Sequence, residues 1–98
     1  MVYENFLKDL KLINELENID KGVFILTDYQ KVLFEIISLT NNTEVPDIIV
    51  NDIIKTLNID INDILYKGYI RISNYIVYQF INIKNNNKVI GYLMEDII

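Results

Sequence analysis

The side chains that most often carry out catalysis are scarce in this sequence. It contains no histidine and no cysteine, so it lacks the commonest general base and the thiolate nucleophile. Its only serines, Ser38 and Ser73, therefore have no histidine to activate them. The three glycines, at positions 22, 68 and 91, are isolated and form no phosphate-binding loop. We therefore expect a protein that is not an enzyme and that needs no cofactor.

Carboxylates remain as possible metal ligands. Asp60 and Asp63 stand among asparagines, a pattern that superficially suggests calcium binding. A calcium-binding EF-hand loop needs glycine at its sixth position and glutamate at its twelfth. Counted from Asp60, these positions hold Leu65 and Arg71. We expect no metal site and interpret Asp60 as a helix cap.

Tyrosines are the most conspicuous of the remaining functional side chains. Tyrosine joins an apolar ring to a polar tip and is enriched at protein interfaces. Many tyrosines in one segment can also reflect their high strand propensity, which is the simpler explanation, or a surface that stacks single-stranded bases. Five of the seven tyrosines cluster between residues 66 and 92, and four of these are predicted to contact a partner: Tyr69, Tyr75, Tyr78 and Tyr92.

Acidic residues dominate the first two thirds of the chain. Residues 1–65 hold twelve acids and five lysines, whereas residues 66–98 hold four bases and two acids, within a net charge of −5. A negative surface would orient docking on a basic groove, although acids also simply keep a protein soluble. The acids predicted to contact a partner are Glu15, Glu17, Asp28, Glu44, Asp47 and Asp52.

Helices are predicted wherever apolar residues recur every three or four positions. Thr27 and Gln30 have the spacing of a capping box at a helix start, and Pro46 suits the first turn of a helix. The predicted helices span residues 2–18, 28–39, 46–57 and 60–67.

Strands are predicted where the apolar residues alternate instead. The pattern changes after Gly68, and Ser73-Asn74 has the length of a tight hairpin connection. The predicted strands span residues 69–72, 75–84 and 88–94, with one further short apolar strand at residues 23–26. The sequence therefore predicts one α+β domain over residues 1–98, with three or four helices followed by a three-stranded antiparallel meander.

Both faces of the predicted sheet are apolar. Ile76, Tyr78 and Phe80 point to one face of their strand, and Val77 and Ile81 point to the other. Either helices cover both faces, or one face meets a partner, which includes a second copy of the chain in a homodimer.

The order of these elements resembles a winged helix-turn-helix domain over about residues 28–94. Residues 46–57 and 60–67 correspond to its helix pair, and residues 84–88 to the tip of its wing. The resemblance implies a DNA-binding regulator, although Asp60 and its neighbours stand where a DNA-reading helix would carry basic or amide side chains. Its predicted nucleic-acid contacts are Arg71, Lys84, Asn86 and Lys88.

Our leading expectation is non-catalytic protein binding. The most concrete form is a small acidic inhibitor or adaptor of the kind encoded by phages or mobile elements, which blocks a larger partner such as a nucleic-acid-binding protein. The winged-helix regulator is the alternative. No apolar run approaches the ~20 residues of a membrane span and no signal peptide is recognisable, so a cytoplasmic location is expected.

Overall fold

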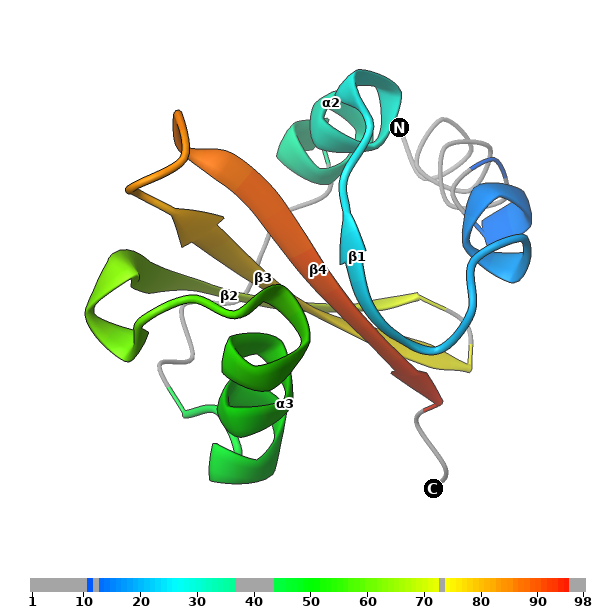
Figure 1. Ribbon diagram of the computed structural model, residues 1–98. Helices are drawn as coiled ribbons and strands as arrows, with labels where there is room; N and C mark the ends of the chain where they lie inside the picture. The colour runs from blue at the N-terminus through cyan, green and yellow to red at the C-terminus, as the bar shows by residue number, and fades with distance from the viewer. Residues whose placement is uncertain (1–10, 12, 37–43, 73, 96–98) are drawn as a thin grey trace.

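A four-stranded antiparallel sheet forms the centre of the computed structural model, which describes residue 11 and residues 13–36, 44–72 and 74–95 (Figure 1). The strand order is β1-β4-β3-β2. The strands are β1 (Gly22–Ile25), β2 (Ile64–Ile72), β3 (Tyr75–Asn82) and β4 (Lys88–Glu95).

The predicted α+β class is confirmed, but the sheet is larger than the predicted three-stranded meander. The strand expected near residues 23–26 is present as β1, and it joins the sheet by pairing antiparallel with β4, from Gly22 opposite Leu93 to Ile25 opposite Ile90. Local pattern alone does not specify this pairing, because the two strands are far apart in the chain.

Helical structure precedes the sheet and also lies between β1 and β2. Residues 11 and 13–17 are helical, in agreement with part of the predicted 2–18 helix, whose remainder lies largely outside the described residues. Elsewhere in the described residues lie the helices α2 (Asp28–Ile36) and α3 (Asp47–Leu57) and the one-turn 3-10 helix η1 (Ile61–Asp63).

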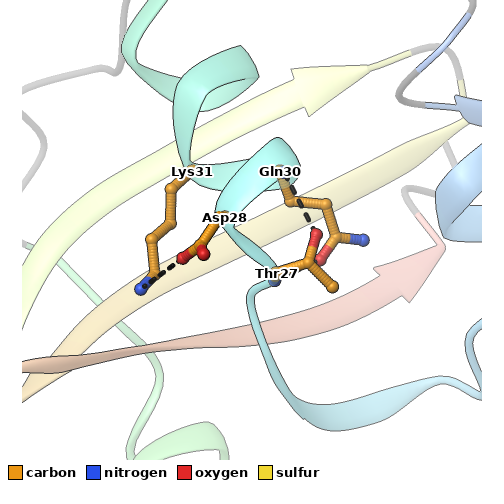
Figure 2. A network of polar contacts seen from close by, with 4 residues as sticks. All are labelled: Thr27, Asp28, Gln30 and Lys31. Atoms are coloured by element: carbon orange, nitrogen blue, oxygen red, sulfur yellow. Dashed lines mark hydrogen bonds and ion pairs between the residues drawn. The ribbon is translucent and has the colours of Figure 1, made fainter.

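The start of α2 is fixed by the predicted capping box. The backbone N–H of Thr27 donates to Gln30 Oε1 at 2.9 Å, and the backbone N–H of Gln30 donates to Thr27 Oγ1 at 3.2 Å. Figure 2 shows the Gln30 side chain turned back toward Thr27. Each side chain thus satisfies one of the backbone donors left free at a helix start.

The predicted helix over residues 60–67 is wrong. Asp60 does cap a turn, since its Oδ1 accepts from the backbone N–H of Asn62 at 3.0 Å, but only the three residues of η1 follow before β2 begins. Ile64 and Tyr66 pack into the core on one side of the sheet, and pairing with β3 extends from Ile64 opposite Asn82. These long-range contacts outweigh the local helical pattern.

A β-bulge interrupts β2 between Tyr66 and Gly68. Gly68, which was expected just after the predicted helix over residues 60–67, lies inside the strand with φ +120°, a conformation that residues with side chains rarely adopt. The bulge shifts the strand by one residue, and this determines which later side chains of β2 point to each face.

Helices cover both faces of the sheet. Of the two explanations for its apolar faces, cover by helices or contact with a partner, the structure shows the first. Figure 1 shows α2 and α3 on opposite sides of the strands. On the side that we call the α2 face, the buried residues are Leu16, Leu26, Leu33, Phe34, Ile70, Ile72, Val77 and Leu93. On the α3 face they are Ile49, Ile53, Ile76, Tyr78, Phe80 and Ile90.

The winged-helix topology is not confirmed. Its second helix is replaced by η1 and the start of β2, so the element that would enter the major groove is missing. None of the helices described in the structure has both the length and the apolar composition to cross a membrane.

Candidate binding site on the α3 face

Three tyrosines lie in one row across the α3 face. Tyr69 of β2 pairs with Tyr78 of β3, which pairs in turn with Tyr92 of β4. The ring centroids of Tyr69 and Tyr78 are 5.6 Å apart and tilted by 50°, within the usual range for interacting aromatic rings. Cross-strand register thus gathers three of the four tyrosines that the sequence singled out.

The bulge places a fourth tyrosine beside this row. Tyr66 and Tyr69 are three positions apart, so in a regular strand they would point to opposite faces. The extra residue at the bulge brings both to the α3 face, where the Tyr66 ring lies 6.4 Å from Tyr78 and 5.1 Å from Phe80. Tyr75, the remaining candidate, packs against the core of the α2 face instead.

Helix α3 packs over the Tyr92 end of the row. Ile49 and Ile53 are buried against the sheet, and the Tyr92 hydroxyl donates to Asp52 Oδ2 at 2.8 Å. This hydrogen bond, followed by burial and the nearby carboxylate charge, raises the pKa of Tyr92. Asp52 is therefore a contact between helix and sheet, and its other oxygen, Oδ1, accepts from the Thr56 hydroxyl at 3.3 Å.

The other end of the row opens into a pocket of about 550 Å³ at the start of α3. The rings of Tyr69 and Tyr78 and the side chain of Ile76 come from the sheet, and Arg71 adds a cation. The chain leading into α3 supplies the opposite wall. We call this site the tyrosine pocket, and its lining residues are Glu44, Val45, Pro46, Tyr69, Arg71, Ile76 and Tyr78.

The pocket combines aromatic rings with one charge of each sign. The Arg71 guanidinium lies 5.8 Å from the centroid of the Tyr69 ring, in the range of a cation–π contact. Nearby, the Tyr66 hydroxyl lies 3.5 Å from the backbone oxygen of Glu44. Burial, and then its proximity to Tyr78 and Tyr69, raises the pKa of Tyr66 to about 12, so this phenol is a neutral donor at neutral pH.

The acidic candidates do not form one surface. Glu15 and Glu17 are exposed on the helical segment whose Leu16 packs on the α2 face, and Asp28 lies at the start of α2, 3.6 Å from Lys31. Glu44 and Asp47 are exposed beside the tyrosine pocket, and Asp52 lies on α3. The second group, but not the first, lies with the tyrosine row.

The candidate nucleic-acid residues are also divided. Lys84, Asn86 and Lys88 are exposed at the connection between β3 and β4. Arg71 pairs with Ile76, near the opposite end of β3, about 20 Å away at the usual rise of a strand. These four residues therefore do not make one basic face. Among the residues that the structure describes, no group of three or more acids gathers as a metal site.

Three lining residues were not predicted: Val45, Pro46 and Ile76. The sequence marked Pro46 only as a helix start and Ile76 only as an apolar residue on one face of its strand. Their place in the pocket depends on how α3 approaches the sheet, for which the sequence holds no local signal. Tyr66 belonged to the predicted tyrosine cluster without being assigned a contact.

Comparisons of the chain with known protein families, with curated proteins and with solved structures found no match. The fold and the site therefore define the class: an α+β domain whose antiparallel sheet lies between helices and carries a tyrosine-lined pocket. Any function has to be argued from the chemistry of that pocket.

Proposed function

We propose that this chain is a non-catalytic protein-binding module, a small acidic inhibitor or adaptor, and that it contacts its partner through the tyrosine pocket. The observation that carries the proposal is the open aromatic pocket beside charged, exposed side chains. Buried aromatic side chains flanked by polar ones are typical of the residues that dominate binding energy at protein interfaces.

The tyrosines of the pocket are held in place before any partner arrives. Tyr78 is buried next to the rings of Tyr66 and Tyr69, and Tyr69 is half-buried and pairs with it across the strands. A side chain already fixed by packing loses little conformational freedom on binding, which favours affinity. The sheet thus offers a rigid apolar floor, and Glu44 and Arg71 offer charges that orient a partner.

A binding role also fits the chemistry that the pocket supplies. Its ionisable groups are one carboxylate, one guanidinium and two phenols, and the sequence holds no histidine or cysteine to act beside them. We therefore assign these groups to recognition and give none of them a role in proton transfer or nucleophilic attack.

The proposal is tested by capturing the partner from the native host with matched tyrosine variants. Tyr69→Ala removes a pocket ring, whereas Tyr29→Ala removes an exposed tyrosine from α2, outside the pocket. We expect the first variant to weaken binding roughly 30-fold, the cost of about 2 kcal/mol for a central aromatic contact, and the second to change it little. Thermal melting of both variants would show that each remains folded.

Two outcomes would contradict the proposal. One is a wild-type protein that is recovered alone as a monomer. The other is a partner whose binding is unchanged by Tyr69→Ala but is lost when Glu15 and Glu17 become lysines, because this would place the interface on the α2 side of the molecule.

A further inference from the structure

The contact between Arg71 and Tyr69 indicates which chemical group the tyrosine pocket accepts. The exposed Arg71 side chain places its guanidinium 5.8 Å from the centroid of the Tyr69 ring. The negative face of an aromatic ring attracts cations, and a planar guanidinium also stacks on it. The chain itself therefore contains the type of contact that a partner's arginine would make.

The charges around the pocket favour a cation over an anion. Glu44 lines the pocket, and Asp47 is exposed in the first turn of α3. The carboxylate of Asp47 opposes the partial positive charge of that helix end, which would otherwise attract anions. Arg71 is the only basic residue in the lining, and the chain as a whole carries a net charge of −5.

We propose that the partner inserts an arginine side chain into the tyrosine pocket, where its guanidinium replaces that of Arg71 over the Tyr69 ring and pairs with Glu44. This inference rests on the proposed function and names the chemistry of the partner. Arg71 then acts as a competitor of the incoming arginine, both by occupying the ring and by repelling a second cation.

This competition predicts whether replacing Arg71 strengthens or weakens ligand binding. Arg71→Ala removes the guanidinium from over the Tyr69 ring and with it the like charge, so an arginine ligand binds more tightly. For a ligand that carries a carboxylate or phosphate, the same substitution removes the attractive cation and weakens binding. The sign of the change therefore distinguishes the two kinds of ligand.

The test uses a blocked pentapeptide, acetyl-Gly-Arg-Gly-Arg-Gly-amide, titrated at low salt into the ¹⁵N-labelled chain of residues 1–98. Three peptides of the same length replace the arginines by lysine, by the uncharged isostere citrulline or by glutamate. Shifts of the backbone amides of Tyr69 and Ile76 report on the pocket, and those of Lys84 and Lys88 serve as a remote control.

We expect the arginine peptide to shift the pocket amides, the lysine peptide to bind more weakly and the citrulline and glutamate peptides not to bind. Arg71→Ala should tighten arginine binding about threefold, and Glu44→Gln should weaken it about threefold, as is usual for exposed cation–π and ion-pair contacts. Spectra of the free variants would confirm that both are folded.

The inference is overturned if Arg71→Ala weakens binding, if the glutamate peptide binds better than the arginine peptide, or if the shifts centre on Lys84 and Lys88. The absence of any shift up to about 10 mM peptide, a concentration at which even millimolar binding would be detected, also overturns it. If the captured partner still depends on Tyr69 in that case, the proposed function stands and only the arginine specificity fails.

Discussion

The packing of Phe24 on Gly91 allows a quantitative test of the sheet that carries the site. Phe24 in β1 pairs with Gly91 in β4, and its ring lies over the glycine. A Cβ atom at position 91 would collide with the Cζ and Cε1 atoms of Phe24 and would lie 2.8 Å from Leu26 Cδ1. Gly91→Ala therefore forces the ring to move, and overpacking of this kind costs about 1–3 kcal/mol.

The assay is a double-mutant cycle measured by urea and thermal unfolding. In the wild-type background, we expect Gly91→Ala to lower the midpoint of thermal unfolding by about 4–8 °C for each kcal/mol lost. Phe24→Leu removes the ring atoms that collide, so Gly91→Ala should cost less in that background, with a coupling energy of about 1 kcal/mol.

Gly22→Ala is the matched control for this cycle. A Cβ atom there has no neighbour within 4 Å, but the residue has φ +114°. Its cost therefore comes from the backbone and should not be relieved by Phe24→Leu. If Gly91→Ala proves neutral, or if its cost is the same with and without the ring, the Phe24 ring of β1 does not pack on Gly91 of β4.

Three further predictions concern stability: two remove one hydrogen bond each, and the third follows the ionisation of one tyrosine. Tyr92→Phe removes the 2.8 Å hydrogen bond to Asp52 and should lower the unfolding free energy by about 0.5–1.5 kcal/mol in urea titration, while an unchanged midpoint would mean that the bond adds nothing. Thr27→Ala removes the side-chain acceptor for the N–H of Gln30 and should cost about 1 kcal/mol by the same assay, with a smaller loss for Thr27→Ser, which keeps the hydroxyl. The pKa of Tyr66 is raised from 10.0 to about 12, so Tyr66 ionises at a lower pH in the unfolded chain than in the folded protein. The neutral phenol therefore contributes its full stability below pH 10, and this contribution is lost as the pH rises toward 12. Thermal melting should therefore show that Tyr66→Phe loses less stability than the wild type between pH 10 and 12. An equal loss in both proteins would contradict the raised pKa of Tyr66.

The elements that the sequence predicted well are those fixed by neighbouring residues. Thr27 and Gln30 satisfy each other's backbone groups within one turn, so the start of α2 is visible in the sequence. The alternation in β3 likewise predicts that Ile76 and Tyr78 share a face. Both patterns express local geometry directly.

The parts that were missed depend on contacts between distant residues. Ile64 and Tyr66 join a strand because β3 pairs with them, although the spacing of Ile61, Ile64 and Leu65 also suits a helix. The tyrosines of the site were singled out individually, but their common row requires the register of three strands and a bulge that no local signal reveals. The wall formed by Val45 and Pro46 requires, in addition, the docking of α3.

The pairing of β1 with β4 has a consequence for the order in which the protein is made. Gly22 lies opposite Leu93, so one edge strand leaves the ribosome long before the strand that receives it. Closing a loop of this length costs entropy that only the final contacts repay, which slows folding. Until β4 emerges, Phe24 in the nascent chain has no glycine on which to pack, so its ring stays exposed to solvent.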